Sequence, residues 1–173
     1  MKIALLGYGK MGKVIEKIAL ERGHEIVLRK DSSDTFEGIT NADVAIDFSV
    51  PSSAVSHISE CLNQNVPVIS GTTGWLEKYD EMVHLCQEKN GSFIYASNFS
   101  LGVNIFFELN NYLAKMMKNL KDYNVSMEEI HHTQKLDAPS GTAITLAEGV
   151  IKHTDYANWT LETPISNEIH IEA

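Results

Sequence analysis

The sequence predicts an α/β protein: a doubly wound parallel sheet with helices on both faces, followed by a second domain. Three observations support this fold class. Short apolar runs typical of buried parallel strands alternate with longer segments of helical period. The first run ends in a glycine-rich turn that opens a helix. The pattern then changes near Leu101-Gly102-Val103, which predicts one domain over 1–102 and another over 103–173.

The strands expected in the first domain are short apolar runs bounded by glycine, proline or polar residues. They are Lys2–Leu6, Glu25–Leu28, Val44–Phe48, Pro67–Ser70 and Ser92–Ala96. The expected helices repeat apolar residues on one face. They are Met11–Glu21, Pro51–Asn63 and Leu76–Lys89. Strands that alternate with helices in this way form a parallel sheet.

The second domain has fewer regular segments. An apolar-rich helix is expected over Ile105–Leu120. Tyr123–His131 alternates like a half-exposed strand, and a further helix is expected over Thr142–Lys152. The sequence ends inside an expected strand, Glu168–Glu172.

Size and charge narrow the function classes. With 173 residues, 43% of them hydrophobic, the chain suits a globular protein of one or two small domains. The net charge of −9 argues against a nucleic-acid partner, because no basic stripe can neutralise phosphates. No apolar run is long enough to span a bilayer, and the first meets glycines too early for a secretory signal, so a cytoplasmic protein is expected. Cys61 and Cys86 form no metal-type or redox-type pair and are expected to be reduced thiols.

Gly7-Tyr8-Gly9-Lys10-Met11-Gly12 has the pattern G-x-G-x-x-G between an expected strand and an expected helix. In such a loop Gly7 makes the tight turn, Gly9 lets the backbone approach a pyrophosphate, and Gly12 lets the helix pack on the strand. The N–H groups at the helix start attract phosphates. The motif therefore predicts a dinucleotide site, the alternative being a structural glycine turn.

The residues after the second strand bear on which dinucleotide binds. An acidic residue about 20 positions beyond the glycines usually holds the ribose 2′-hydroxyl, whereas a cation there favours a 2′-phosphate. This chain has Arg29-Lys30-Asp31, which contains both. Because the cations come first, NADPH is the expected cofactor, with NADH as a second option. The alternative is a solvated charge cluster.

Three further loops follow strands and so lie at the carboxyl edge of the sheet, where doubly wound folds bind ligands. They are Asp47-Phe48-Ser49, Gly71-Thr72-Thr73-Gly74 and Ala96-Ser97-Asn98-Phe99-Ser100. The Gly-Thr-Thr-Gly loop offers amides and hydroxyls that could cradle a nicotinamide ribose or carboxamide, or it is only a turn. Asn98 could bond a carboxamide or cap its own turn.

The stretch HHTQKLDAPSGT, from His131 to Thr142, gathers two imidazoles, an ammonium, a carboxylate and a turn. Adjacent histidines invite a metal site, but on an extended strand His131 and His132 point to opposite faces, and no metal is expected. The same alternation gathers on one face Glu129, His131, Thr133 and Lys135. An imidazole beside an ammonium suits an acid and an anion clamp for reducing a carboxylate-bearing C=C or C=N bond. Singly, such residues are usually only surface.

Pro139-Ser140-Gly141-Thr142 precedes an apolar helix, which Ser140 or Thr142 can cap. Free amides at that helix start would hold a carboxylate by the same physics that holds a pyrophosphate. The alternative is a cap with no ligand.

Together these motifs resemble the dihydrodipicolinate reductase family, also called hydroxytetrahydrodipicolinate reductase, of bacterial lysine and diaminopimelate synthesis. The resemblance covers Met1 to about Lys152. It is carried by GYGKMG at Gly7–Gly12, GTTGW at Gly71–Trp75, ASNFSLGVN at Ala96–Asn104 and, most specifically, HHTQKLDAPSGTA at His131–Ala143. It implies a Rossmann-type domain followed by an α+β substrate-binding and oligomerisation domain, in a homotetramer. The family reduces a cyclic dicarboxylate to tetrahydrodipicolinate with NADPH or NADH.

The resemblance also implies residue roles. His131 and Lys135 would be catalytic. The substrate carboxylates would be held by His132, Lys135, Ser140, Gly141 and Thr142. The pyrophosphate would be held by Gly9, Lys10, Met11 and Gly12, and the adenosine half by Phe48 and Ser49. The nicotinamide side would be lined by Gly71, Thr72, Thr73, Ala96, Ser97, Asn98 and Phe99. The motif analysis adds Gly7, Arg29 and Lys30 to the cofactor set.

The family's second domain normally continues for several more strands and a last helix. The chain is therefore expected to be a fragment, an incomplete sequence or an abbreviated member. Glu168–Glu172 would then be an exposed edge, and packing partners would be missing for Trp159, Ile165, Ile169 and Ile171. Two alternatives to a reductase of this family are a non-catalytic dinucleotide-binding module and another two-domain dehydrogenase of the aspartate pathway.

Overall fold

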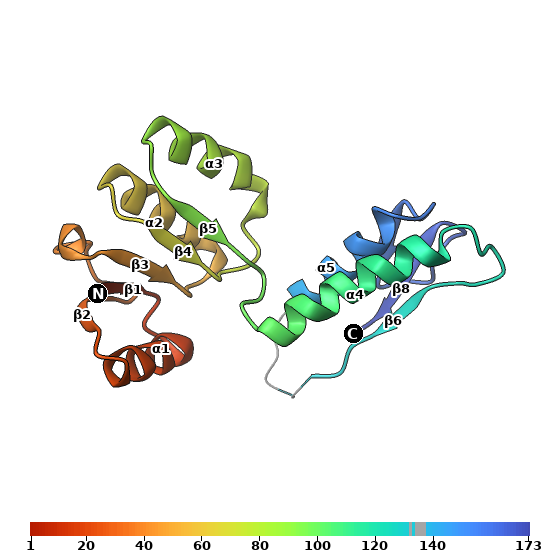
Figure 1. Cartoon of the computed structure of the whole chain (residues 1–173), viewed down its shortest axis with the longest axis horizontal. Helices are drawn as coiled ribbons and strands as arrows, with labels where there is room; N and C mark the ends of the chain where they lie inside the picture. The colour runs from red at the N-terminus through yellow and green to blue at the C-terminus, as the bar shows by residue number, and fades with distance from the viewer. Residues whose placement is uncertain (132, 134–137) are drawn as a thin grey trace. The chain divides into compact units, whose positions relative to one another are not determined.

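The computed structural model describes residues 1–131, 133 and 138–173, and the chain divides into two compact units, Met1–Ala96 and Ser97–Ala173. Each unit has its own sheet and its own hydrophobic core (Figure 1). Within the described residues, no helix is both long enough and apolar enough to cross a membrane.

The first unit contains a five-stranded, fully parallel sheet in the order β2-β1-β3-β4-β5. Its strands are β1 (Lys2–Leu6), β2 (Glu25–Lys30), β3 (Val44–Asp47), β4 (Val68–Ser70) and β5 (Phe93–Tyr95). Its helices are α1 (Lys10–Glu21), α2 (Pro51–Asn63) and α3 (Tyr79–Glu88), with short 3-10 turns η1 (Ile39–Asn41) and η2 (Leu76–Lys78). The predicted α/β fold is confirmed. The differences are confined to the ends of elements and to η1, which the sequence does not predict.

Alternate residues of the strands pack against helices on opposite faces of the sheet. On one face Leu6 packs with Ile58 of α2 and Met82 of α3. On the other face Leu5 packs with Ala19 of α1. Figure 1 shows the same division, with α2 and α3 on one side of the sheet and α1 on the other. Both faces are therefore covered, which explains why the strands read as continuous apolar runs.

The strand order reverses at β1, which has β2 on one side and β3 on the other. The carboxyl ends of β1 and β3 therefore form a topological switch point, where doubly wound sheets bind ligands. The register pairs Leu6 with Asp47 at this edge. The glycine loop after β1 and the Phe48-Ser49 loop after β3 consequently leave the sheet side by side.

The second unit combines two helices, α4 (Leu101–Met117) and α5 (Gly141–Ile151), with a three-stranded sheet in the order β6-β8-β7. The strands are β6 (Ser126–Glu128), β7 (Asn158–Thr160) and β8 (Glu168–Glu172), and both pairings are parallel. The strand predicted over Tyr123–His131 is shorter than expected. The helix predicted from Ile105 begins earlier, at Leu101, because the Ser100 side chain caps it. The sequence does not predict β7, which is too short to show a period.

The expectation that β8 is an exposed edge with unpacked isoleucines is wrong. β8 is the central strand of its sheet, and Ile169 and Ile171 are both 0% exposed. They cluster with Val150 of α5, and Trp159 packs against the same cluster. Only Ile165 among the four residues in question is exposed, at 68%. The strands β6 and β7 supply the neighbours that a local reading of the sequence misses.

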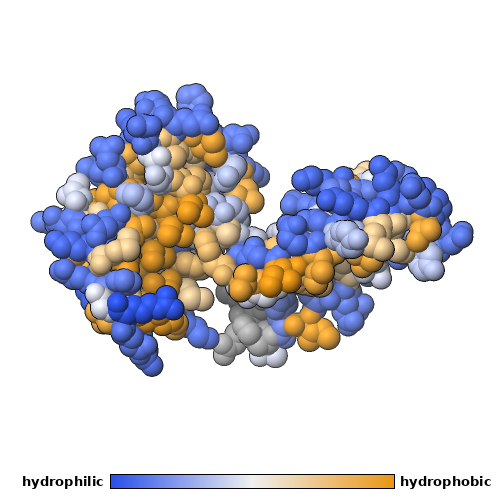
Figure 2. Space-filling view, in the orientation of Figure 1, coloured by the Kyte–Doolittle hydropathy of each residue, from blue (hydrophilic) through white to orange (hydrophobic). Residues whose placement is uncertain are grey.

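One face of α4 is apolar and open to solvent (Figure 2). More than half of the residue surface is exposed for Ile105, Phe106, Leu109, Tyr112, Leu113 and Met116. Contiguous apolar patches of this kind are typical of surfaces that another protein segment covers.

Replacing Ile169 by alanine should lower the free energy of unfolding of the second unit by about 2–5 kcal/mol, because it leaves a cavity in a fully buried cluster. Ile165→Ala is the matched control, since Ile165 is 68% exposed, and should change stability by less than about 0.5 kcal/mol. Urea titrations followed by fluorine NMR of fluorotryptophan would report the two units separately, through Trp75 and Trp159. Equal effects of the two substitutions would contradict the central position of β8.

Candidate functional site

Gly7 forms the turn that ends β1, and two features require glycine there. Its φ of +89° lies in the left-handed region. A Cβ at this position would lie 2.3 Å from the carbonyl oxygen of Phe48 and 2.7 Å from the Cα of Ser49. The N–H of Gly7 donates to the carbonyl of Lys30 at 2.9 Å. The missing side chain thus lets the loops after β1 and β3 meet.

Gly9 and Gly12 serve different purposes. A Cβ on Gly12 would lie 2.5 Å from the carbonyl oxygen of Gly7, so this glycine lets α1 pack against the turn. Gly9 precedes α1 and provides no side-chain cap, and a Cβ on it would meet nothing within 4 Å. Lys10 and Met11, the first residues of the helix, are exposed. An uncapped helix start beside open space fits a pyrophosphate, as the motif predicts.

Lys30, one of the two cations predicted to bear on the cofactor, is buried. Its ammonium donates to the carbonyl oxygens of Asp34 at 2.7 Å and Asp31 at 3.2 Å. It also lies over the ring of Phe36, 4.8 Å from the ring centre. The loop that follows β2 therefore holds the Lys30 ammonium in place.

Arg29, the other cation, keeps 44% of its side chain exposed. Its Nε donates to Glu16 of α1 at 2.7 Å, and the Tyr8 hydroxyl donates to the same carboxylate. The hydrogen bond between Arg29 and Glu16 raises the pKa of Arg29 and lowers the pKa of Glu16. Of the two cations at the end of β2, Arg29 is thus the one that a ligand could reach from solvent.

A buried carboxylate to which the sequence analysis assigns no role organises the loops at this edge. Asp47, the last residue of β3, is 0% exposed. Its Oδ1 accepts from the hydroxyl of Ser49 at 2.7 Å and lies 2.8 Å from Nδ1 of His57. Its Oδ2 accepts from the hydroxyls of Ser70 and Thr72, both at 2.8 Å. These four partners replace the water that a buried charge loses.

The same network fixes the predicted cofactor loops. The hydroxyl of Thr72 accepts from the amide of Ser49 at 2.8 Å, and its carbonyl accepts from the indole of Trp75 at 2.6 Å. A Cβ on Gly71 would lie 2.3 Å from the ring of Phe48, so this glycine lets the ring lie against the loop. The structure therefore brings together four predicted cofactor residues of the two loops, Phe48, Ser49, Gly71 and Thr72.

The segment predicted to line the nicotinamide contains the division between the units, since Ala96 ends the first and Ser97 begins the second. The side-chain oxygen of Asn98 accepts from the amide of Ser100 at 2.8 Å, so Asn98 caps its own turn. This was one of its two predicted roles. Phe99 is 47% exposed. Contact of this segment with a nicotinamide stays a prediction.

In the second unit, Glu129 joins His131 to the start of α5. Its Oε2 lies 2.8 Å from Nε2 of His131 and accepts from the hydroxyl of Ser140. Its Oε1 accepts from the backbone N–H of Ser140 at 2.6 Å. The prediction that Glu129 and His131 share one face is confirmed, although β6 already ends at Glu128.

Ser140 is the N-cap of α5, and its hydroxyl accepts from the amide of Ala143 at 3.1 Å. Its own two donors are taken by Glu129. No described residue accepts from the amides of Gly141 or Thr142, so these N–H groups remain open for an anion. His132 and Lys135, also predicted site residues, lie outside the described residues.

Opposing effects act on the Glu129 carboxyl. Burial raises its pKa, but the hydrogen bonds from Ser140 and His131 outweigh burial, and the pKa lies below its ordinary value. Glu129 is therefore ionised at neutral pH and accepts hydrogen bonds from both residues.

The other metal-binding or nucleophilic side chain types of the described residues add no further site. Within the described part of the chain, no group of three or more His, Cys, Asp or Glu side chains could hold a metal ion. Cys61 and Cys86 are free thiols. Burial, with smaller effects of Asp47 and Glu60, raises the pKa of Cys61 to about 12, so this thiol is unreactive at neutral pH.

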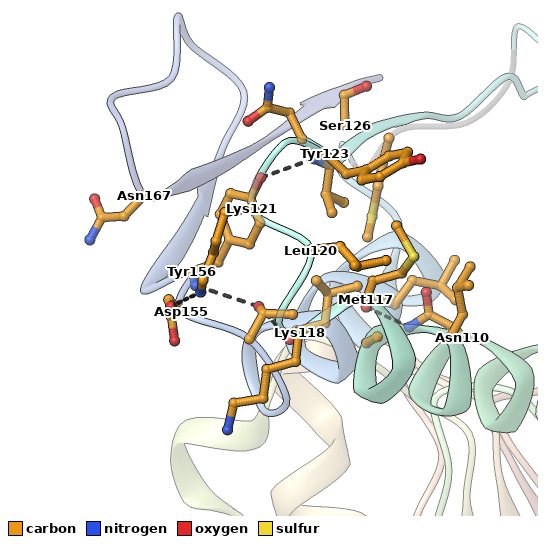
Figure 3. A pocket seen from close by; sticks show the side chains of 18 of the residues that line it. Asn110, Met117, Lys118, Leu120, Lys121, Tyr123, Ser126, Asp155, Tyr156 and Asn167 are labelled. Carbon is orange, nitrogen blue, oxygen red and sulfur yellow. Dashed lines mark hydrogen bonds and ion pairs between the residues drawn. The ribbon is translucent and has the colours of Figure 1, made fainter.

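A cavity of about 740 Å³ lies in the second unit, among α4, α5 and the chain over 120–128 (Figure 3). Its walls are mainly apolar and include Leu113 and Met117. At its edge the Tyr156 hydroxyl accepts from the amide of Val125 at 2.9 Å. Its described lining includes neither His131 nor the start of α5, so it is separate from the candidate site.

The fold and the glycine loop define the class of protein. A parallel sheet whose first strand leads through G-x-G-x-x-G into an uncapped helix start, at the switch point of the sheet, is a dinucleotide-binding domain of the Rossmann class. The second unit adds an imidazole and an open helix start, which suit an enzyme that acts on an anionic substrate.

Comparison with known proteins identifies the family. The family described as "Dihydrodipicolinate reductase, N-terminus" matches residues 1–99, and the family described as "Dihydrodipicolinate reductase, C-terminus" matches residues 102–173. The chain belongs to the dihydrodipicolinate reductase family.

Individual relatives agree with this assignment. The chain is 51% identical to the 4-hydroxy-tetrahydrodipicolinate reductase of Christiangramia forsetii, over 100% of this chain and 74% of the relative. It is 31% identical to the enzyme of the same name from Neisseria meningitidis serogroup B, over 86% of this chain and 63% of that relative. The structure of a dipicolinate-bound dihydrodipicolinate reductase from Paenisporosarcina sp. TG-14 matches 99% of this chain and 78% of that chain, with a TM-score of 0.67 at 24% identity. The two share a fold.

Ser70→Ala should lower the free energy of unfolding of the first unit by about 1–3 kcal/mol, because it removes a hydrogen bond to the fully buried Asp47 carboxylate. Ser56→Ala is the control. It makes the same chemical change on the exposed surface of α2 and should cost less than about 0.5 kcal/mol. Urea unfolding followed through Trp75 would compare the two. If Ser70→Ala were as stable as the wild type, the carboxylate would not depend on its hydroxyl donors.

Proposed function

We propose that this protein catalyses the NAD(P)H-dependent reduction of 4-hydroxy-tetrahydrodipicolinate to tetrahydrodipicolinate, in lysine and diaminopimelate biosynthesis. The observation that carries the proposal is a family match that runs through both units. In this reaction the 4-hydroxyl group leaves as water together with one hydrogen of the ring, and the unsaturated ring then gains one hydride and one proton. The nicotinamide, when bound, supplies the hydride.

The cofactor would lie along the carboxyl edge of the first sheet. The pyrophosphate would bind at the start of α1, which the open space beside Gly9 supports. The adenosine half would lie near Phe48 and Ser49, and the nicotinamide near Gly71-Thr72-Thr73. The shared Asp47 network, which orders both loops without a ligand, supports this placement.

NADPH, NADH or both would serve as the reductant. The exposed Arg29 at the end of β2 supports use of NADPH, because a guanidinium there can pair with a 2′-phosphate. The charge of Lys30 is already engaged by carbonyl groups of its own loop. Comparison of kcat/KM for the two cofactors would decide between them.

The substrate would bind in the second unit. His131 would supply the proton, and Lys135 would act with it as the second catalytic residue. The carboxylates would be held by Lys135, His132 and the amides of Gly141 and Thr142. Ser140 would contribute through its position as the cap of α5, since both its donors bond to Glu129.

The setting of the enzyme belongs to the same proposal. We place a dinucleotide-binding domain over 1–102 and a substrate-binding and tetramerisation domain from 103 onward, in a cytoplasmic homotetramer. The support is the resemblance to the family, and the exposed apolar face of α4 is consistent with association.

Purified protein, supplied with NADPH and enzymatically generated substrate, should consume NADPH, measured as loss of nicotinamide absorbance. His131→Gln and Lys135→Ala should each lower kcat by a factor of roughly 10²–10⁴, the usual contribution of general acid–base catalysis, with little change in NADPH binding. Normal turnover by both variants would refute these roles. A folded wild-type protein that binds NADPH but reduces no dicarboxylate would instead be a non-catalytic dinucleotide-binding module.

Gly9→Ala should weaken NADPH binding at least tenfold while leaving the free energy of unfolding within about 0.5 kcal/mol of wild type. Its Cβ would enter space that is open in the protein and that the proposed pyrophosphate would fill. Gly12→Ala is the contrasting variant, and it should destabilise the first unit because its Cβ would lie 2.5 Å from the Gly7 carbonyl oxygen. Calorimetric titration and urea unfolding would separate the two effects. Unchanged NADPH affinity in Gly9→Ala would argue against a pyrophosphate at this loop.

A further inference from the structure

Glu129 stands where it can hold His131 in one orientation. Its backbone N–H donates to the carbonyl of Glu172 in β8 at 2.8 Å, which ties its main chain to the sheet. The side chain of Glu129 is only 13% exposed, whereas that of His131 is 38% exposed. The carboxylate thus occupies a defined position beside a more exposed ring.

The contact determines how the imidazole presents its two nitrogens. A carboxylate can only accept hydrogen bonds, so Nε2 of His131 must carry a proton where it faces Oε2 of Glu129, 2.8 Å away. Nδ1 has no hydrogen-bond partner among the described residues. When the ring carries both protons, the proton on Nδ1 is therefore the one that can pass to a bound substrate, and the ring is left neutral with its proton on Nε2.

The same carboxylate is tied to the start of α5. It accepts from both the hydroxyl and the backbone N–H of Ser140, the residue that caps this helix. The next two amides, those of Gly141 and Thr142, are the ones that α5 leaves open. The Glu129 side chain consequently positions both the imidazole of His131 and the helix start that carries the open amides.

On the basis of the proposed reductase function, we propose that Glu129 is a positioning residue that fixes His131 through Nε2, in register with the open start of α5, and leaves Nδ1 as the proton-donating atom. A carboxylate-bearing substrate would then meet its proton donor and its anion site in one rigid arrangement. Neither the composition nor the spacing of the motif assigns this role to Glu129.

Glu129→Gln tests the proposal because an amide keeps the shape of the carboxylate but has one acceptor atom in place of two. The backbone N–H of Ser140 can only donate, so the amide oxygen should stay beside it. The NH₂ should then face Nε2 of His131, which can respond by moving its proton to Nδ1. We expect kcat to fall roughly tenfold to a hundredfold, less than loss of the imidazole itself, with an unchanged KM for NADPH. Glu128→Gln, the same change at the exposed neighbouring residue, should behave as wild type.

Nitrogen NMR of isotope-labelled histidine reads the tautomer without any turnover. In the wild type, neutral His131 should carry its proton on Nε2, and Glu129→Gln should shift it toward the Nδ1-protonated form. His131→Gln would identify the resonance among the seven histidines of the chain. Ser140→Ala, which removes the hydroxyl but keeps the carboxylate beside Nε2, should leave the tautomer unchanged.

These results separate positioning from a structural role. A cap that acts only on α5 would lower stability in both Glu129→Gln and Ser140→Ala and would leave the tautomer alone. An unchanged tautomer in Glu129→Gln, or a wild-type ring protonated on Nδ1, would overturn the proposal even if turnover fell; the wild-type measurement decides should that variant not fold. Failure of the wild type to reduce the dicarboxylate would refute the proposed function, and the tautomer would still show whether Glu129 holds His131.

Discussion

A fully buried carboxylate imposes strict conditions on its surroundings, and the first unit is built around one. Removing an ionised side chain from water is costly unless other donors replace the water. Asp47 finds its partners in the loop after β3, in α2, and at the end of β4 with its following loop. Because Gly7 lies against the backbone of Phe48, the glycine loop is positioned by the same arrangement. The glycine loop and the loops after β3 and β4 therefore depend on satisfying one charge.

The second unit meets the same requirement in a more open setting. Glu129 gathers its donors from His131 and Ser140, so satisfying the charge also orients the imidazole that we propose to be reactive. Neither Asp47 nor Glu129 accepts a hydrogen bond from the first N–H groups inside α1 or α5. The starts of α1 and α5 consequently keep N–H groups for external anions. This separation would allow a chain of net charge −9 to hold anions at the two sites that we propose.

The sequence predicts the parts of the fold whose signals lie within a short segment of the chain. In the first unit each strand and helix shows its own period, and all five strands and three helices are predicted with errors only at their ends. In the second unit β7 has three residues, too few to show a period. The central place of β8 depends on pairing with β6 and β7, which lie far apart in the sequence, so no local pattern around Ile169 reveals it.

The candidate site likewise has a part that the sequence predicts and a part that it does not. The glycine loop, the shared face of Glu129 and His131, and the capped start of α5 are predictable because their residues are close in sequence. Two of the partners of Asp47, Ser70 and Thr72, lie 23 and 25 residues away, and only the parallel pairing of β3 with β4 brings them to it. An acidic residue inside the apolar run Val44–Phe48 is nevertheless a signal, because such a charge requires buried donors. In a parallel sheet those donors must come from the ends of neighbouring strands, so the sequence indicates the kind of partner that Asp47 needs but not which strand provides it.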